Sequence, residues 1–268
     1  MMIPCSANLG YLFTEYSLPD AIRESAKAGF KAVECHFPYE VPVEEVRQSL
    51  AETNLPMLGL NTIRGNVNRG DNGLAALPKR IREAKEAIDQ AIAYGAMLGA
   101  RHVHVMAGRT PVSGESEQCF VENLIYAGKA AGRENMSILI EPMNPRNAPN
   151  YFLRTVEQAS ELAGKTQLDN VKIMFDCYHV QINQGDVLKR FERHLPLIGH
   201  VQFASVPDRG EPDRGELDYS WLLPQFMKLG YTGFFGAEYR PRSQNADHPT
   251  SEGLEWLKKN SIKSCLGK

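Results

Sequence analysis

Cysteine is scarce in this sequence, and its spacing is irregular. The 268 residues contain only Cys5, Cys35, Cys119, Cys177 and Cys265. Their number is odd and no two of them form a C-x-x-C pair, so the pattern excludes a disulfide framework and a cysteine-based zinc or redox site. Such cysteine usage is typical of a reducing compartment, and we expect the protein to reside in the cytoplasm.

A surplus of positive charge and a long apolar run near the N-terminus are also absent. The chain has 30 lysines and arginines against 32 aspartates and glutamates, a formal net charge of −2. Without an excess of cations to neutralise phosphates, nucleic acid is not an expected partner. Pro4, Asn8 and Glu15 interrupt the apolar residues at the start of the chain, so we expect neither a signal peptide nor attachment to a membrane.

The phosphate-binding motifs of nucleotide enzymes are missing as well. The chain contains no G-x-x-x-x-G-K-[ST] loop, and no G-x-G-x-x-G turn follows an expected strand, so NAD and ATP are not expected as cofactors. What the chain does contain is 43% hydrophobic residues, enough at this length to bury a large core and to exclude a disordered chain. The length fits either two ordinary domains or one α/β barrel of roughly 250 residues.

Short apolar runs alternate with amphipathic segments along the whole chain, which is the pattern of parallel βα units. The first unit shows the signals clearly, because Ser17 can cap a helix, Pro19 lies in its first turn and Gly29 follows its end. We expect strands at 3–8, 31–35, 57–60, 102–106, 138–141, 171–175, 198–203 and 234–237. We expect helices between Ser17 and Gly29 and at 43–52, 78–98, 116–133, 155–163, 186–191, 219–228 and 251–263.

Eight such units without a linker or a change of composition predict an α/β fold, a single (β/α)8 TIM barrel that forms one domain over residues 1–268. The alternative is a doubly wound open sheet. That fold would ordinarily have fewer units at this length and a phosphate-binding turn, so we favour the barrel.

Polar side chains end four consecutive strands of the expected barrel. They are Glu141 in ILIEPMN, Asp176 in VKIMFDCYH, Gln202 in HVQFAS and Glu238 in FFGAEYRP. The intervals of 35, 26 and 36 residues each match about one βα unit, so one oxygen ligand is expected on each of strands five to eight. Since the carboxyl ends of barrel strands face the catalytic mouth, these four side chains should converge there.

Three carboxylates packed together repel one another, and a bound divalent cation is the simplest way to keep all of them ionised. Oxygen ligands favour Mg²⁺ or Mn²⁺, while the neighbouring His179 leaves Zn²⁺ or Co²⁺ open. A solvated rim would explain any one of the four residues equally well, but four in consecutive units are better explained by a shared ion.

These segments resemble the xylose-isomerase-like TIM barrels, and among them the hydroxypyruvate isomerase and oxo-tetronate isomerase family. The resemblance spans nearly the whole chain and is strongest in NLGYLFTE, VECHFPYE, FDCYHVQ, IGHVQFAS with PDRGEPDRGELDY, and GFFGAEYRP. One departure is Ala204-Ser205, where family members often have Ala-Asp. The resemblance implies that Glu141, Asp176, Gln202 and Glu238 hold the metal, that the two glutamates are the catalytic acid and base, and that His179 and Arg209 contact substrate oxygens.

The expected chemistry follows from these parts. A 2-hydroxy carbonyl compound that chelates the cation has a polarised carbonyl, which stabilises the ene-diolate formed when a proton leaves carbon. We assign Glu238 as the main base and Glu141 as the proton donor or acceptor on the other face. The expected reaction is isomerisation of a short hydroxy-oxo acid, such as hydroxypyruvate to tartronate semialdehyde, or of an oxo-tetronate.

Three other functions are weighed against this one. A ketose 3-epimerase would use the same residues, but such relatives usually have His where Gln202 stands, and their sugars need no carboxylate-binding Arg209. Metal-dependent apurinic endonucleases hold several zinc ions through many histidines, and the ligand set here is too sparse for them. A noncatalytic ligand-binding barrel predicts that Glu141→Gln and Glu238→Gln leave the physiological activity intact.

Further residues are candidates for the pocket wall. Arg64 and Arg109, in the loops after strands three and four, are candidate anion-binding residues, and His36, Tyr11 and Phe13 are candidate lining residues. His102 and His104 share one face of the fourth strand, which could be the barrel interior or the helix layer, and they are not assigned to catalysis. The resemblance also implies a homodimer or a homotetramer.

Overall fold

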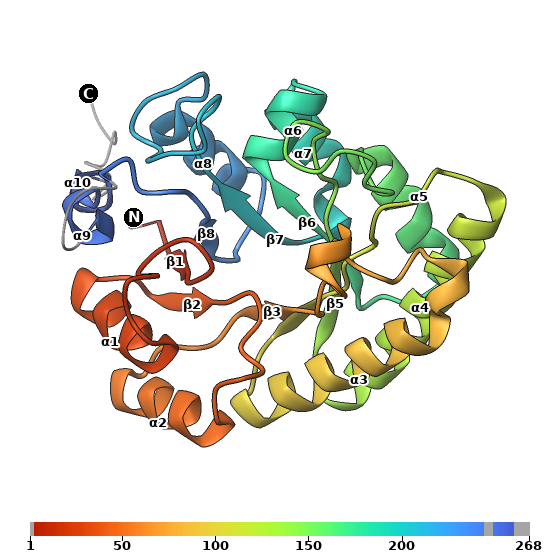
Figure 1. The fold of residues 1–268 in the computed structure, drawn as a ribbon. Helices are drawn as coiled ribbons and strands as arrows, with labels where there is room; N and C mark the ends of the chain where they lie inside the picture. The colour runs from red at the N-terminus through yellow and green to blue at the C-terminus, as the bar shows by residue number, and fades with distance from the viewer. Residues whose placement is uncertain (1–2, 244–248, 260–268) are drawn as a thin grey trace.

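A computed structural model describes residues 3–243 and 249–259 of the chain. Eight strands form one sheet in the order β2-β1-β8-β7-β6-β5-β4-β3, and every pair of neighbours in this order is parallel (Figure 1). The strands are β1 (Cys5–Asn8), β2 (Ala32–Glu34), β3 (Gly59–Asn61), β4 (His102–His104), β5 (Ser137–Ile140), β6 (Val171–Asp176), β7 (Ile198–Phe203) and β8 (Phe235–Ala237).

The ends of this sheet, β2 and β3, meet through backbone hydrogen bonds. Val33 and Met57 form a parallel bridge, the N–H of Leu58 donates to the carbonyl of Val33 at 2.7 Å, and the N–H of Cys35 donates to the carbonyl of Gly59 at 3.0 Å. These bonds bring the two edge strands together and nearly close the ring. The expected TIM barrel is therefore confirmed.

Helices surround the strands on the outside of the ring (Figure 1). The α-helices are α1 (Leu18–Ala28), α2 (Val43–Thr53), α3 (Ile81–Leu98), α4 (Gly114–Arg133), α5 (Val156–Thr166), α6 (Cys177–Asn183), α7 (Val187–His194), α8 (Tyr219–Lys228), α9 (Pro249–Glu252) and α10 (Glu255–Lys259). Short 3₁₀ helices are η1 (Val67–Arg69), η2 (Pro78–Arg80) and η3 (Leu195–Leu197). In the described part of the chain, no helix has both the length and the apolar character needed to cross a bilayer.

Most elements lie where the sequence pattern predicts them, and α1 shows why. The hydroxyl of Ser17 accepts a hydrogen bond from the N–H of Asp20, and Gly29 ends the helix with a positive φ of 98°. The expected helix at 78–98 instead begins as the 3₁₀ turn η2, and the expected helix at 251–263 is divided into α9 and α10. Residues 260–263 of that expected helix lie outside the described residues.

One helix was not expected. Helix α6 begins directly after β6, because the carboxylate of Asp176 caps it by accepting a hydrogen bond from the N–H of Tyr178 at 2.8 Å. The apolar and aromatic residues around this point resemble a continuing strand, so periodicity alone does not reveal the turn. The consequence is that His179 lies one helical turn above the end of β6.

The apolar core lies between the strands and the helices, whereas the inside of the barrel is polar. The ring of Phe175 on β6 packs 5.5 Å from Phe191 of α7, which stacks on Phe226 of α8 at 3.8 Å. The opposite faces of the strands bury hydrogen-bonding side chains in the barrel interior, among them Glu34, His200 and Gln202. Buried polar groups need hydrogen-bond partners, so these side chains form a hydrogen-bonded network rather than an apolar core.

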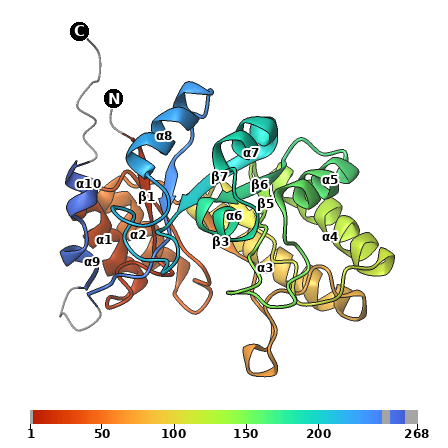
Figure 2. The same ribbon diagram turned by 90° about the horizontal axis from the view of Figure 1, so that it is seen from above.

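The long segment between β3 and α3, which contains η1, extends away from the rest of the barrel (Figure 2). It is attached to the next loop along the barrel by backbone hydrogen bonds. The N–H groups of Leu74 and Ala75 both donate to the carbonyl of Met106, and Gly73 bridges to Ala107. This attachment gives the segment a defined position over one side of the barrel mouth.

Candidate active site

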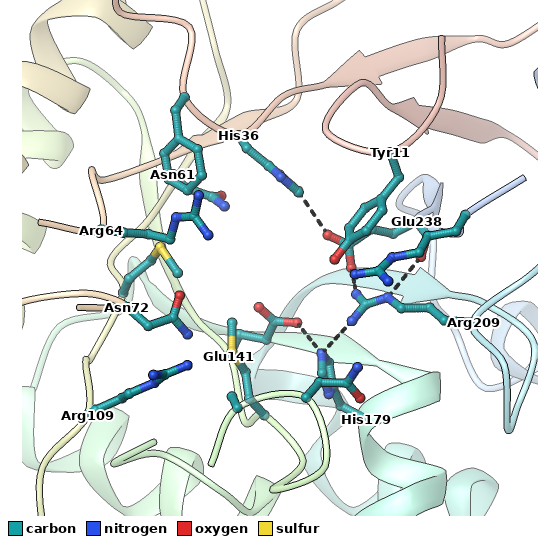
Figure 3. Close-up of a pocket in the computed structure, with 16 residues that line it drawn as sticks. Tyr11, His36, Asn61, Arg64, Asn72, Arg109, Glu141, His179, Arg209 and Glu238 are labelled. Carbon is teal, nitrogen blue, oxygen red and sulfur yellow. Dashed lines mark hydrogen bonds and ion pairs between the residues drawn. The ribbon is translucent and has the colours of Figure 1, made fainter. Parts of the chain in front are cut away.

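A pocket of about 250 Å³ lies at the carboxyl ends of the strands. Residues at or beyond the end of every one of the eight strands line it, from Tyr11 after β1 to Glu238 and Arg240 after β8. Figure 3 shows Glu141, His179, Arg209 and Glu238 grouped at one end of this pocket. This is the place where barrel enzymes assemble their active sites.

The acidic end of the pocket is built from three strands. Glu141 directly follows β5, Asp176 ends β6 and Glu238 directly follows β8. Ligand atoms of Glu141, Asp176 and His179 lie within 4.8 Å of one another, and all three residues are buried. The structure therefore brings together two of the four residues that the sequence proposes as metal ligands, Glu141 and Asp176, with the expected substrate contact His179.

Arg209 lies among these carboxylates. Its Nη2 donates to Oδ2 of Asp176 at 3.2 Å and to Oε2 of Glu238, while its Nη1 lies 3.1 Å from Nε2 of His179. The guanidinium is buried and packs over the rings of Tyr11 and Tyr178, each 4.9 Å from the ring centroid. Its donors toward the acidic end are thus directed at groups of the protein itself.

Glu238 is held by three neighbours. Its Oε1 accepts a hydrogen bond from the side-chain amide of Asn8 at 3.0 Å and lies 3.1 Å from Nε2 of His36, while Oε2 pairs with Arg209. Burial raises the pKa of this carboxyl, but the charge of Arg209 and the hydrogen bond from His36 outweigh burial and hold the pKa at about 2.

The pKa values of the other two carboxyl groups shift in the opposite direction. Burial raises the pKa of Glu141 well above its usual range, and the charges of Glu238 and Asp176 raise it further. Burial also raises the pKa of Asp176 to about 7, against the opposing charge of Arg209. A cluster of this kind is stable in its ionised form only when more positive charge is supplied.

His179 has a fixed ring orientation. The backbone N–H of Asn144 donates to its Nδ1 at 3.1 Å, while Nε2 lies 3.1 Å from Nη1 of Arg209 and 3.5 and 3.7 Å from carboxylate oxygens of Asp176 and Glu141. Burial and the charge of Arg209 lower the pKa of His179 well below its usual range, so the ring is neutral. The ring is thus held at the acidic end of the pocket by Asn144 on one side and by Arg209 on the other.

Gln202 lies inside the barrel, paired in register with Asp176 on the neighbouring strand. Its Nε2 donates to Oε2 of Glu34 at 2.9 Å, and Glu34 also accepts a hydrogen bond from Ser6 at 3.0 Å and lies 3.1 Å from Nε2 of His200. Since the amide nitrogen is engaged by Glu34, the amide oxygen is turned away from it. Gln202 is not among the residues that line the pocket itself.

The donor set of this cluster fits a divalent cation. Oε1 of Glu141 and Oε1 of Gln202 are both buried and have no hydrogen-bond partner among the described residues. Buried oxygens without a partner are rare and costly unless an ion or a water completes them. Three carboxylates and one amide oxygen are the ligand types that Mg²⁺ and Mn²⁺ prefer.

Comparison with known proteins agrees with this architecture. The chain matches the model of the xylose isomerase-like TIM barrel family over residues 22–260. The chain belongs to this family.

A 2-oxo-tetronate isomerase of Cupriavidus necator is 40% identical over 256 residues, which cover 94% of this chain and 96% of the relative. The hydroxypyruvate isomerase of Escherichia coli K12 is 35% identical over 259 residues, which cover 96% of this chain and 98% of the relative. A crystal structure of a Brucella melitensis protein, described as a family 2 AP endonuclease, superposes with a TM-score of 0.90 at 35% identity and covers 96% of this chain and 99% of that one. This protein is therefore an isomerase, as the resemblance implies.

The remaining sequence candidates of this xylose isomerase-like barrel divide into two groups. Tyr11, His36, Arg64 and Arg109 all line the pocket. Phe13 does not, because its ring is buried in the core beside Phe30. Its backbone N–H donates to the hydroxyl of Thr250 at 2.7 Å, which ties the first βα loop to α9.

The two histidines of β4 face the barrel interior, which settles the orientation that the sequence leaves open. His104 lies with Nδ1 3.8 Å from Oε2 of Glu141, and burial lowers its pKa to about 3. The ring of His102 stacks at 6.2 Å on that of His200. Both side chains thus lie inside the barrel beneath the pocket, where neither ring nitrogen of His104 has a hydrogen-bond partner among the described residues.

Two residues of the barrel isomerase were not among the sequence candidates. Both carry the signal used for the other ligands, a polar residue at the end of a strand. Asn8 ends β1 and Glu34 ends β2, so each is a polar residue at the carboxyl end of an apolar strand, as Asp176 is. Asn8 contacts the catalytic candidate Glu238 and Glu34 contacts the ligand candidate Gln202. Asn144, which orients His179, lies in a loop and carries no such signal.

Proposed function

We propose that this protein is a divalent-metal-dependent isomerase of a short hydroxy-oxo acid, either hydroxypyruvate, giving tartronate semialdehyde, or a 2-oxo-tetronate. The observation that supports it most directly is that ligand atoms of the buried Glu141, Asp176 and His179 lie within 4.8 Å of one another at the barrel mouth, with unpartnered oxygens on Glu141 and Gln202. The relatives named as hydroxypyruvate isomerase and 2-oxo-tetronate isomerase support the choice of substrate class.

Glu141, Asp176, Gln202 and Glu238 would hold the cation, with Mg²⁺ or Mn²⁺ favoured by the oxygen donors and Zn²⁺ or Co²⁺ left open. When bound, the cation supplies polarisation of the substrate carbonyl and neutralises the negative charge that develops on the two substrate oxygens. The rest of the chemistry belongs to the side chains of the protein.

Glu238 is the base. Its carboxylate is kept ionised by Arg209 and His36, and it takes the proton from the hydroxymethyl carbon of hydroxypyruvate. Glu141, which starts protonated, gives its proton to the neighbouring carbon, and the hydroxyl proton moves between the two substrate oxygens, so that the carbonyl and the hydroxyl exchange places. Proton exchange with solvent then returns Glu238 to its ionised form and Glu141 to its protonated form. His179 and Arg209 contact substrate oxygens beside the two glutamates, while the ring of Tyr11 lines the pocket and packs against Arg209.

A ketose 3-epimerase is the alternative, because return of the proton to the opposite face of the same carbon needs the same two glutamates. The deciding experiment offers hydroxypyruvate, 2-oxo-tetronates and ketohexoses separately to the purified protein, stripped with a chelator and reloaded with Mg²⁺, Mn²⁺, Co²⁺ or Zn²⁺. We expect turnover of an acid, loss of turnover after stripping and recovery with Mg²⁺ or Mn²⁺. Turnover of ketohexoses alone would establish the epimerase instead.

We also propose that the chain forms one domain and acts in the cytoplasm as a homodimer or a homotetramer on a small-molecule substrate. Support comes from the single sheet to which all eight strands belong and from the free cysteines of the described residues. Light scattering coupled to size-exclusion chromatography measures the oligomeric state. A single cooperative unfolding transition is expected for one domain.

A further inference from the structure

The pocket has a second end whose chemistry is opposite to that of the first. Arg64, in the loop after β3, and Arg109, in the loop after β4, both line it. Figure 3 shows these two arginines and Asn72 on the side of the pocket away from Glu238 and Arg209. One pocket therefore carries carboxylates at one end and guanidinium groups at the other.

The two ends differ in how their arginines are engaged. Arg209 is buried and donates to Asp176 and Glu238. Neither Arg64 nor Arg109 forms an ion pair with any carboxylate in the described ranges 3–243 and 249–259. The guanidinium of Arg64 packs over the ring of Phe37, 5.0 Å from its centroid. Both guanidinium groups thus retain donors for a ligand.

These two side chains extend from ordered backbone. The N–H of Gly73 donates to the carbonyl of Arg64 at 2.9 Å, and the N–H of Phe152 donates to the carbonyl of Gly108, next to Arg109, at 2.9 Å. Gly73 and Gly108 approach so closely that a Cβ on Gly108 would lie 2.4 Å from the carbonyl oxygen of Gly73. This contact joins the two loops, so Arg64 and Arg109 are held on one wall.

The charges around the pocket favour an anion. Four arginines line it, while the carboxylates of Glu141, Glu238 and the adjacent Asp176 provide three negative charges, so one positive charge remains in excess. A bound dication would raise that excess to three. A neutral sugar would leave this positive charge unmatched, whereas a carboxylate would compensate part of it.

We propose that Arg64 and Arg109 form the site that binds the substrate carboxylate and so select acids over neutral sugars. Asn72 lies between them in the view of Figure 3 and offers its side-chain amide as a further donor. The acid substrate then lies across the pocket, with its carboxylate at the arginine end and its reacting carbons between Glu141 and Glu238. The inference rests on the proposed function for the reaction, but the binding itself can be tested separately.

The test uses two ligands of nearly the same shape, one anionic and one neutral, neither of which can isomerise. Pyruvate lacks the hydroxyl group at its third carbon, and pyruvamide is its uncharged amide. Isothermal titration of both into the Mn²⁺-loaded protein compares wild type, Arg64→Gln, Arg109→Gln and the double variant. Arg69→Gln is the matched control, because Arg69 is an exposed arginine of the same loop that does not line the pocket.

We expect wild type to bind pyruvate more tightly than pyruvamide, and each single variant to weaken pyruvate binding roughly 10- to 100-fold, as for the loss of a charged hydrogen bond. Binding of pyruvamide and of Mn²⁺ should change little, and Arg69→Gln should behave as wild type. With hydroxypyruvate as substrate, KM should rise more than kcat falls.

Two results would overturn the proposal. One is equal binding of pyruvate and pyruvamide by wild type, and the other is an undiminished preference for pyruvate in the double variant. A further outcome is that wild type prefers pyruvate and the variants lack that preference, while wild type isomerises neither hydroxypyruvate nor a 2-oxo-tetronate. In that case the carboxylate site stands and the proposed reaction fails. If the reaction proceeds and the variants keep their KM, the reaction stands and this assignment fails.

Discussion

The two ends of the pocket differ in whether their arginines are paired with carboxylates of the protein. At the β5–β8 side, Glu238 and Arg209 are buried and bonded to each other and to their neighbours. At the β3–β4 side, Arg64 and Arg109 extend from loops, and the protein provides no acid partner for either within its described residues. The first end has the character of a preorganised reaction centre, and the second has the character of a receptor for a charged group.

This difference teaches where rigidity and selectivity reside. The Glu238–Arg209 pair at the first end is buried and fixed by its contacts within the barrel, so its chemistry changes only when the pair is broken. A pair of guanidinium groups on joined loops can change between related proteins without disturbing the strands. Reaction type should therefore depend on the β5–β8 side, and substrate choice on the β3–β4 side.

The largest effect is expected from the two glutamates. Glu141→Gln and Glu238→Gln each remove a proton-transferring carboxylate from the reaction centre, so kcat should fall by at least about 10²-fold. Steady-state kinetics measures this, and Glu40→Gln, an exposed glutamate outside the pocket, is the control. Unchanged activity in both variants would show that the acidic end is not catalytic, which is what a ligand-binding barrel predicts.

The next effect concerns metal binding, measured without any substrate. Mn²⁺ at about 100 times its dissociation constant adds about 2.7 kcal/mol to the free energy of unfolding. For a chain of this size that corresponds to a rise in Tm of roughly 5–10 °C. Asp176→Asn should abolish the rise because it removes a ligand charge, while Asp89→Asn on the surface of α3 should retain it. Equal rises in both variants would place the ion elsewhere.

A smaller effect is expected at Glu34, which distinguishes support of the centre from the centre itself. Glu34→Gln replaces an acceptor of the Gln202 amide with a side chain that can also donate, so the amide loses its fixed orientation. Loss of such a supporting contact commonly lowers metal affinity about 10- to 100-fold. Ser6→Ala removes a different hydrogen bond to the same carboxylate and is the control. If both variants show the same decrease in Tm and neither changes the affinity for Mn²⁺, the role of Glu34 is structural only.

The contact between the two loops can be tested at Gly73. This residue has a φ of 110°, and a Cβ there would lie 2.6 Å from the carbonyl oxygen of Met106. Gly73→Ala should separate the loops, cost about 1–3 kcal/mol in stability and weaken pyruvate binding. Gly99→Ala is the control, because Gly99 has a φ of 65° but its Cβ would meet no atom within 4 Å. Equal effects in both variants would argue against a role for the contact.

The smallest effect is the pH dependence of the loop that carries Arg209. The hydrogen bond from Arg242 lowers the pKa of Asp208 to about 2, below the value of about 3.9 in an unfolded chain. The interaction therefore stabilises the folded state above about pH 4 and is lost as the pH falls toward 2. The difference in Tm between wild type and Asp208→Asn should shrink over that interval. A constant difference would show that Asp208 acts through something other than its charge.

The sequence pattern predicts the barrel well because each βα unit is a local signal. Ser17 and Gly29 bound α1 as expected, since a side-chain cap and a left-handed glycine act within a few residues. Helix α6 was missed because its start depends on Asp176 acting as a cap, which no periodicity reveals. The division of the last helix into α9 and α10 depends on packing, because Thr250 and Trp256 meet residues far away along the chain.

The site was predicted in part for a similar reason. A polar residue at the end of an apolar strand is visible in the sequence, and this rule finds Glu141, Asp176 and Glu238. It does not reveal what each of them contacts. That Arg209 pairs with Asp176 and Glu238, and that Glu34 takes the amide of Gln202, depends on side chains brought together from different strands.

The amino-acid order alone determined the eight repeating units, and with them the ring of strands and the side on which the polar strand ends gather. The reason is that hydrophobic periodicity, capping and glycine conformation are all local. Only the tertiary structure decided that Arg209 is neutralised by the protein, while Arg64, Arg109 and Arg240 line the pocket without an acid partner among the described residues. That outcome depends on distances between residues far apart along the chain, because electrostatic pairing and burial are properties of the folded arrangement and not of the order of residues.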